Sequence, residues 1–155
     1  NIQNETELGN KANEYVNSGK LVPDTIVTEM IEKWLLQNNE NWILDGFPRT
    51  INQAESLDNI LNSNTQILNI VLLISVPNNI LENRLLDRQS IENRSDDNIE
   101  TIKIRIDTYE QETKPLISYY KKTGLLSEID GSLSISEVSS KIKNKLINIE
   151  NKINN

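Results

Sequence analysis

The sequence predicts an α/β fold, an open parallel sheet with helices on both faces, and three observations support this. Short apolar segments end at residues 44, 76 and 129, and each is followed by a segment with helical periodicity. Residues typical of helix caps and turns lie between the apolar segments and the helical segments. The longest apolar segment is nearly continuous, as is typical of a parallel strand covered on both faces. Alternating strands and helices of this kind form open parallel sheets.

The individual elements follow from hydrophobic spacing and from the residues that start or stop a helix. We predict helices over residues 4–17, from 23, 50–61, 77–88, 97–122 and from 134, and strands over residues 42–44, 68–76 and 125–129. Three pairs have capping-box spacing: Thr50 with Gln53, Asp97 with Glu100, and Ser134 with Glu137. Gly124 is expected to end the long helix, and the Asn- and Lys-rich tail after Leu146 is expected to fray.

The amino-acid composition excludes several classes of function. The 155 residues suit one domain that removes roughly 70% of its unfolded surface from water. A net charge of −7 argues against a nucleic-acid or anionic-membrane partner, and the longest apolar run is too short to cross a bilayer. Cysteine and histidine are both absent, which excludes disulfides, thiolate zinc sites and the commonest general base. The chemistry must use carboxylates, arginines and backbone groups.

Two aspartates follow predicted strands. Asp45 and Asp130 each lie at the carboxyl end of a strand, where ligands of open parallel sheets bind. A single carboxylate at this position suits a magnesium ion that keeps most of its waters. The alternative is an ordinary turn residue, because Asp45-Gly46 is a common turn dipeptide.

Arginine is unevenly distributed along the chain. The five arginines all fall between residues 49 and 105: Arg49, Arg84, Arg88, Arg94 and Arg105. Only guanidinium offers a planar fork that grips phosphate oxygens in a bidentate way. Any one of them is most simply explained as a solvated surface residue. All five together, in a lysine-rich chain, indicate a converging polyphosphate site.

The motif Asp45-Gly46-Phe47-Pro48-Arg49-Thr50, followed by Gln53-Ala54 and Leu57-Asp58, resembles the signature of the adenylate kinases, a family of nucleoside monophosphate kinases with a P-loop NTPase-like fold. Further motifs occur in the family's order: Glu7-Leu8-Gly9, Gly19-Lys20-Leu21-Val22-Pro23-Asp24, Arg84-Leu85-Leu86-Asp87-Arg88, Arg94-Ser95-Asp96-Asp97, Thr113-Lys114-Pro115-Leu116-Ile117 and Ile129-Asp130-Gly131. The resemblance therefore spans nearly the whole chain.

The resemblance implies reversible phosphoryl transfer from MgATP to AMP, giving two ADP, and assigns roles to individual residues. The implied catalytic residues are Arg49, Arg84, Arg88, Arg94 and Arg105. The implied AMP-binding residues are Lys20, Leu21, Val22, Gly46, Phe47, Pro48, Arg49, Gln53, Arg94 and Arg105. The implied ATP-binding residues are Arg84, Arg88 and Leu133, and Asp45 would hold Mg²⁺ through water. Gln53 has a competing local role as the capping partner of Thr50.

By the same resemblance, residues 1–150 form one core domain, with an AMP-binding region at about 1–22, a short lid at about 88–98 and a frayed tail at 151–155. Such a short lid lacks the inserted hairpin and the cysteines of zinc-binding lids, so zinc is not expected. Mg²⁺ is expected as part of MgATP. The expected partners are ATP, AMP and ADP, with no nucleic acid and no membrane. The protein is expected to be a monomer, located in the cytoplasm, or in an organelle if a targeting segment precedes Asn1.

One departure from the family is large. None of the five glycines forms a Gly-x-x-x-x-Gly-Lys phosphate loop. The resemblance implies that this loop, the first two strands of the sheet and a sixth arginine would precede Asn1, so the chain alone is expected to be inactive. Two alternatives stay open: a UMP/CMP kinase of the same family, which Thr50 and Gln53 disfavour, and a catalytically dead truncated fold that only binds nucleotide or a partner.

Overall fold

The structure, a computed structural model, describes residue 15 and residues 20–38, 41–92 and 98–153. The helix predicted over residues 4–17 and the whole of residues 93–97, with Arg94, lie outside the described residues except for Tyr15. The described sheet has two parallel strands, β1 (Val71–Ser75) and β2 (Leu126–Asp130). Their register pairs Val71 with Leu126 and Ser75 with Asp130, so both strands end at the same edge.

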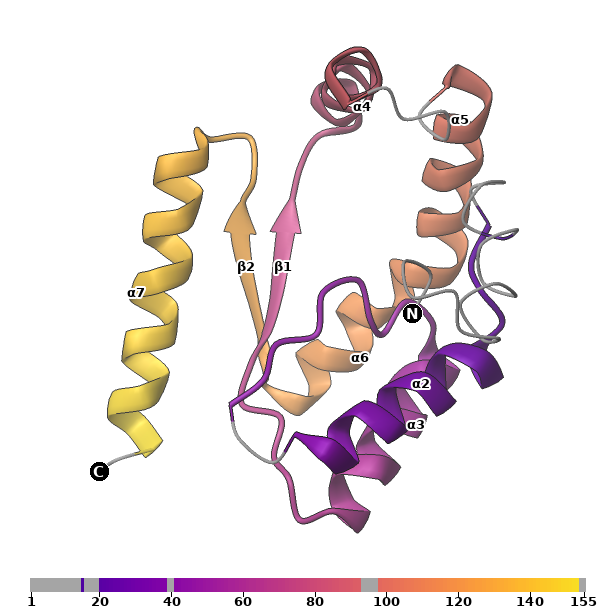
Figure 1. Cartoon of the computed structure of the whole chain (residues 1–155). Coiled ribbons are helices and arrows are strands. Elements are labelled where there is room, and N and C mark those ends of the chain that lie inside the picture. Colours follow the sequence, from indigo (N-terminus) through magenta and orange to yellow (C-terminus); the bar gives the residue numbers. More distant parts are fainter. Residues whose placement is uncertain (1–14, 16–19, 39–40, 93–97, 154–155) are drawn as a thin grey trace.

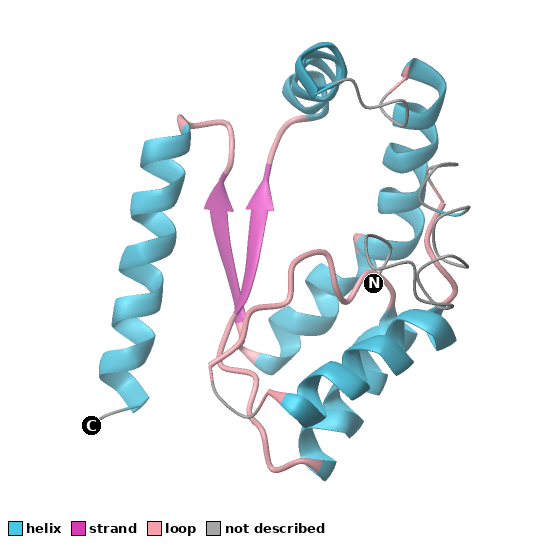
Figure 2. Cartoon of the chain, viewed as in Figure 1, coloured by secondary structure: helices cyan, strands magenta, loops and turns pink. Residues whose placement is uncertain are grey.

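Helices lie on both sides of this sheet, as predicted (Figures 1 and 2). The helices are α2 (Asp24–Gln37), α3 (Ile51–Ser63), α4 (Asn78–Glu92), α5 (Ile99–Thr108), α6 (Pro115–Thr123) and α7 (Ile135–Ile153), with a π-helical turn, η1 (Tyr109–Thr113), between α5 and α6. Helix α7 packs against β2 on one side, and α6 packs against β2 and α3 on the other. Helix α2 packs on α3, farther from the sheet.

Helix α3 holds the core together because two of its faces are apolar. One face packs with α2 in a cluster of Leu35, Phe47, Leu57, Ile60 and Leu61. The other places Ala54 against Leu116 and Tyr120 of α6. Fully burying an aliphatic or aromatic side chain contributes about 1.5–3 kcal/mol, so these two clusters fix the position of α3 and of the loop that leads into it.

The predicted strand at residues 42–44 is not a strand. The segment alternates as a strand would, since Trp42 and Leu44 pack against the core while Ile43 is 82% exposed. Within the described residues, however, β1 pairs with β2 alone and residues 42–44 join no ladder. A strand requires hydrogen bonds to a neighbouring strand, so an alternating pattern without one remains an extended segment.

The long helix predicted over residues 97–122 is divided into α5, η1 and α6. Pro115 has no backbone N–H and occupies the first turn of α6, so the helical ladder is interrupted there. Lys114 N instead bonds Tyr109 O at 2.8 Å, which is the wider π-type turn. The predicted cap also differs: Asn98 caps α5, and its Oδ1 accepts from Thr101 N at 2.9 Å. Gly124 ends α6 in the left-handed conformation, as expected.

Two other helix ends also differ from the predicted positions. Helix α4 continues past Arg88 to Glu92. Helix α7 continues to Ile153, so residues 151–153 are helical in the structure although fraying was expected from Leu146 onward. The capping box at the start of α7 is confirmed, because Ser134 N donates to Glu137 Oε2 at 3.0 Å and Glu137 N donates to Ser134 Oγ at 3.4 Å.

Candidate nucleotide site

The loop from Asp45 to Thr50 joins the extended segment to α3 and presents Arg49 to solvent. Phe47 anchors the loop in the core, with 8% of its surface exposed, and a cis peptide bond joins it to Pro48. Gly46 has a φ of +72°, and a Cβ added there would lie 2.8 Å from Arg49 Nη2. Arg49 Nε donates to Gly46 O at 2.8 Å. The glycine therefore allows the turn and also leaves room for the guanidinium to fold back over it.

Gln53, Thr50 and Asp24 form a polar network at the start of α3. Thr50 Oγ1 accepts from Gln53 N at 3.1 Å, which confirms half of the predicted capping box. The side-chain oxygen of Gln53 accepts from Arg49 N at 2.7 Å instead of from Thr50 N. Asp24, in the first turn of α2, accepts from Thr50 Oγ1 at 2.8 Å and from Gln53 Nε2 at 2.7 Å. The network thus fixes Gln53 beside the backbone of Arg49.

Arg84 and Leu133, two residues of the predicted ATP side, are brought together. Arg84 Nη1 donates to Gly131 O at 2.7 Å, and Nη2 lies 3.5 Å from the carbonyl oxygens of Ser132 and Leu133. These carbonyls belong to the turn between β2 and α7. Helix α4 is therefore tied through one guanidinium to the loop at the carboxyl end of β2.

The same turn depends on Gly131. Gly131 N donates to Ser75 O at 2.8 Å, which extends the strand pairing by one residue. A Cβ at this position would lie 2.5 Å from Ile74 Cγ2 and 2.7 Å from Val76 Cγ2. Only glycine lets the end of β2 approach β1 this closely.

The two strand-end aspartates have different surroundings. Ser132 donates to Asp130 Oδ1 from its hydroxyl at 2.6 Å and from its backbone N at 2.9 Å. These hydrogen bonds hold the pKa of the Asp130 carboxyl below its ordinary value. Asp130 therefore stabilises the turn that Arg84 contacts. Asp45 is exposed at the end of the extended segment, and in the described part of the chain its carboxylate takes part in no hydrogen bond.

Two hydrogen bonds that could not be predicted from the sequence connect η1 and α6 to Arg49 and α3. Thr113 Oγ1, in η1, donates to Arg49 O at 2.9 Å and so holds the carbonyl of Arg49, whereas Gln53 holds its backbone N–H. Tyr119 donates its hydroxyl to Asp58 Oδ2 at 2.6 Å and joins α6 to α3. The interruption at Pro115 is the only local signal for the first contact, because it places Thr113 in a turn instead of a regular helix.

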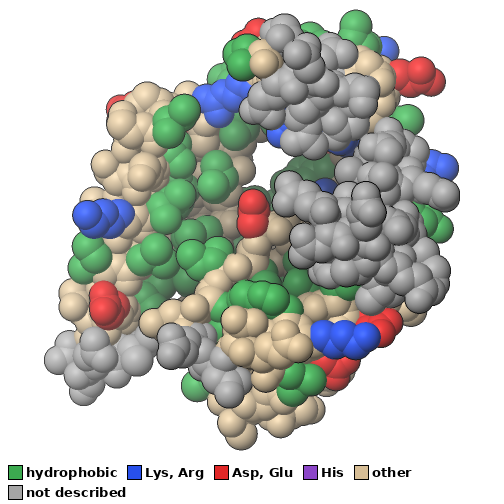
Figure 3. All heavy atoms as spheres, in the orientation of Figure 1, with side chains coloured by type: hydrophobic (Ala, Val, Ile, Leu, Met, Phe, Trp, Pro, Cys, Tyr) green, Lys and Arg blue, Asp and Glu red, His purple; other side chains and the backbone are tan. Residues whose placement is uncertain are grey.

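The remaining predicted residues in the described part of the chain differ in exposure. Lys20 is exposed, and Leu21, Val22, Pro48, Arg88 and Arg105 are half-buried. Among the described residues, no hydrogen bond or ion pair joins Arg49 to Arg84, which lie in separate groups on the loop before α3 and on α4. Figure 3 shows a hollow between the sheet side of the molecule and its helical side, with apolar side chains gathered over the sheet side.

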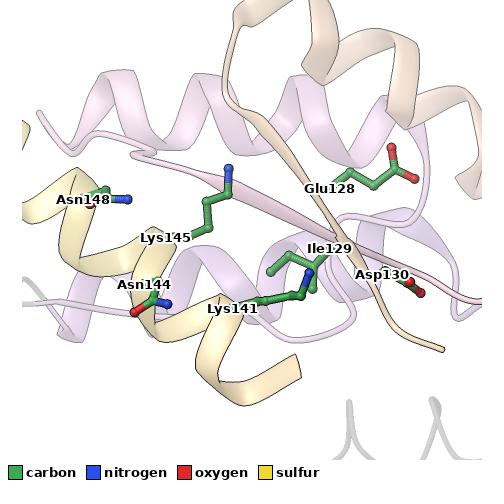
Figure 4. Close-up of a pocket in the computed structure, with 7 residues that line it drawn as sticks. All are labelled: Glu128, Ile129, Asp130, Lys141, Asn144, Lys145 and Asn148. Atoms are coloured by element: carbon green, nitrogen blue, oxygen red, sulfur yellow. The ribbon is translucent and has the colours of Figure 1, made fainter. Parts of the chain in front are cut away.

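Two grooves in the described part of the chain lie elsewhere, beside α7. One of about 240 Å³ is lined by β2 and α7, where Lys141 extends from the helix toward Ile129 (Figure 4). A second, of about 660 Å³, lies at the opposite end of the strands near Leu125. Neither contains a predicted AMP-binding or ATP-binding residue, so these grooves reflect open packing of α7 and do not mark the site that the sequence predicts. None of the helices in the described ranges is both long and apolar enough to span a membrane.

Comparison with known proteins supplies the family. The adenylate kinase family model matches residues 1–125. An adenylate kinase of Prochlorococcus marinus is 45% identical over 141 residues, covering 91% of this chain and 75% of the relative. One from Porphyromonas gingivalis is 43% identical over 91% of this chain and 74% of the relative. One from Azobacteroides pseudotrichonymphae is 41% identical over 96% of this chain and 78% of the relative.

The chain combines a parallel sheet that has helices on both sides with arginines in the loop before α3 and on α4. Together with these relatives, this combination defines a nucleotide phosphotransferase. The chain belongs to the adenylate kinase family. The resemblance stated from its motifs is therefore confirmed.

Proposed function

We propose that the protein containing this chain transfers a phosphoryl group reversibly from MgATP to AMP, giving two ADP. The observation that supports it best is the pairing of Arg49 with Gln53 at the start of α3, through the 2.7 Å bond between Arg49 N and Gln53 Oε1. A guanidinium suits the AMP phosphate and an amide suits the adenine edge. Both residues belong to one short, well-anchored segment.

The other predicted AMP contacts would complete this end of the site. The backbone of Gly46, Phe47 and Pro48 would lie against the AMP phosphate beside Arg49. Residues 20–22 would line the base pocket, and the half-burial of Leu21 and Val22 suits a partly apolar wall.

The donor end of the site would be built around Arg84. Its guanidinium is held by the carbonyl of Gly131 and lies next to the backbone of Leu133, which would contact the ATP base. Arg88 lies four residues later on the same face of α4. Arg94 and Arg105 would reach the transferring phosphoryl group.

Magnesium fits the acidic residues that are present. Within the described residues, no group of three or more acidic side chains is placed to enclose a metal ion. Mg²⁺ needs no such cage, since it keeps several waters and binds through one or two carboxylates plus substrate phosphates. The exposed carboxylate of Asp45 would hold it through water. When bound, the ion neutralises charge on the phosphates.

This chemistry is compatible with a chain that has no histidine or cysteine. Phosphoryl transfer passes through a loose transition state, so positioned cations and exclusion of water do most of the catalysis. No general base with a shifted pKa is required.

The test is ADP formation by the complete gene product that contains these 155 residues, measured in a coupled assay with ATP and Mg²⁺ and with AMP, UMP or CMP as acceptor. AMP is expected to give the highest kcat/KM. Arg49→Lys is expected to lower kcat/KM for AMP by about tenfold or more, because the bidentate fork is lost while the charge remains. The control, Lys33→Arg on the exposed face of α2, should change little. Preference for UMP or CMP would contradict the proposal.

A further inference from the structure

The carboxylate of Asp24 has both oxygens committed to the start of α3. Oδ2 accepts from Thr50 Oγ1 at 2.8 Å, and Oδ1 accepts from Gln53 Nε2 at 2.7 Å. The opposite side of the same amide is also occupied, since Gln53 Oε1 accepts from Arg49 N at 2.7 Å. Gln53 is 2% exposed, so water does not compete freely for these bonds.

The chemistry of the two partners allows only one orientation of the amide. A backbone N–H can only donate, so it must face Gln53 Oε1. An ionised carboxylate can only accept, so it must face Gln53 Nε2. Turning the amide by 180° would lose both hydrogen bonds and place like groups together on each side. Asp24 and the Arg49 backbone therefore set which end of the amide is the donor.

An amide held in one orientation can pair only with a base edge whose donor and acceptor stand in the matching order. Among the described residues, the bonds above leave Gln53 with one Nε2 hydrogen and one Oε1 lone pair uncommitted. Adenine presents an acceptor at N1 beside a donor at the 6-amino group. Hypoxanthine presents the reverse, a donor at N1 beside an acceptor at the 6-oxo group. Contact with either base requires the residues that cover Gln53 to move aside when the nucleotide enters.

We propose that Asp24 is a positioning residue for base selection. By fixing the orientation of the Gln53 amide, its carboxylate makes the monophosphate site accept the adenine edge and reject an edge with the opposite order of donor and acceptor. This inference rests on the proposed function, because it requires the base to meet Gln53. Asp24 touches no reacting group and acts only through Gln53.

The variant that tests this is Asp24→Asn in the complete gene product. Asparagine keeps the size of the side chain but offers a donor as well as an acceptor, so the constraint from α2 is lost and only Arg49 N still orients the amide of Gln53. The measurement is the dissociation constant of AMP and of IMP by calorimetry without ATP, since IMP carries hypoxanthine. The ratio of the IMP constant to the AMP constant is expected to fall about fivefold in the variant, because one of the two hydrogen bonds that fix the orientation of the amide is lost.

Two further variants separate orientation from a loss of stability. Glu29→Gln makes the same chemical change on an exposed part of α2, where Glu29 pairs with Lys33, and should leave the ratio unchanged. Asp24→Glu keeps an acceptor-only carboxylate and is expected to retain selectivity even where Asp24→Asn folds poorly; loss of selectivity in Asp24→Glu would contradict the proposal.

The outcomes distinguish this inference from the proposed function. An unchanged ratio in Asp24→Asn, with AMP still bound by the unaltered protein, overturns the positioning role alone. Weaker binding of both nucleotides by the same factor also overturns it, since that pattern indicates a structural role. Failure of AMP to bind the unaltered protein overturns the proposed function and this inference together.

Discussion

Arg84 of α4 donates a hydrogen bond from Nη1 to the carbonyl oxygen of Gly131 over 2.7 Å, although 47 positions separate the two residues. The contact joins the helix after β1 to the turn after β2, so the carboxyl ends of the two strands are connected by a guanidinium as well as by their own ladder. A residue expected to bind ATP thus also stabilises the backbone of the turn that carries Leu133.

Replacement of Arg84 should separate these two effects. Arg84→Lys keeps the charge but loses the planar fork, and we expect the free energy of unfolding to fall by about 1 kcal/mol with the loss of this hydrogen bond. In the complete gene product, the KM for ATP should rise while the KM for AMP stays within about twofold. Urea unfolding and steady-state kinetics measure the two effects. An equal rise in both KM values would argue against a role limited to the ATP side.

Gly131→Ala should destabilise the fold. The added methyl group would lie 2.5 Å from Ile74 Cγ2 and 3.2 Å from Ser75 O, and the backbone atom cannot move aside easily. We expect a loss of about 1–3 kcal/mol, as is usual for overpacking. Thermal or urea unfolding checks this, with Ser139→Ala on the exposed face of α7 as a control that should change stability by less than about 0.5 kcal/mol. Equal stability of the two variants would show that the turn after β2 relaxes freely.

The bond between Tyr119 and Asp58 should make stability depend on alkaline pH. The hydrogen bond to Asp58, with a smaller effect of burial, raises the pKa of Tyr119 from 10.0 to about 12. Because the folded-state pKa is raised, the contribution is fully present below pH 10 and is lost as the pH rises toward about 12.

Tyr119→Phe isolates this contribution from that of Tyr120, whose pKa burial also raises. The difference in unfolding free energy between the unaltered protein and Tyr119→Phe should be constant below pH 10 and should shrink between pH 10 and about 12. Urea midpoints measured across that range provide the check. A difference that does not change with pH would mean that the hydrogen bond to Asp58 does not persist in solution.

The 155-residue chain studied by itself should form no ADP above background from ATP and AMP. It contains no Gly-x-x-x-x-Gly-Lys loop to hold the ATP phosphates. In the described residues one edge of β1 is unpaired and Ile74 is 48% exposed, so nothing there completes the sheet on that side. A coupled ADP-formation assay on this chain checks the prediction, with the complete gene product as the positive control. Robust turnover by the chain alone would contradict it.

Helix starts and ends could be predicted from the sequence where they depend on residues only a few positions away in the chain. The capping box of Ser134 with Glu137, the end of α6 at Gly124 and the start of α3 after Thr50 all lie where local patterns place them. Each rests on hydrogen bonds within one helical turn, so the residues that make them are adjacent in the sequence. The ordered motifs also indicated the family, because the residues that would contact substrate lie in short continuous strings.

Tertiary structure decided which of the patterns became elements and where the polar side chains are committed. Residues 42–44 alternate like a strand but form no ladder in the described fold, since a strand exists only beside another strand. The partners of Gln53 and Arg84 could not be predicted, because Asp24 and Gly131 meet them only when α2 packs on α3 and α4 reaches the end of β2. The sequence by itself determined the family, the starts of α3 and α7 and the supply of arginines. Packing determined the orientation of the groups that would select a base, since hydrogen-bond direction depends on partners far away in the chain.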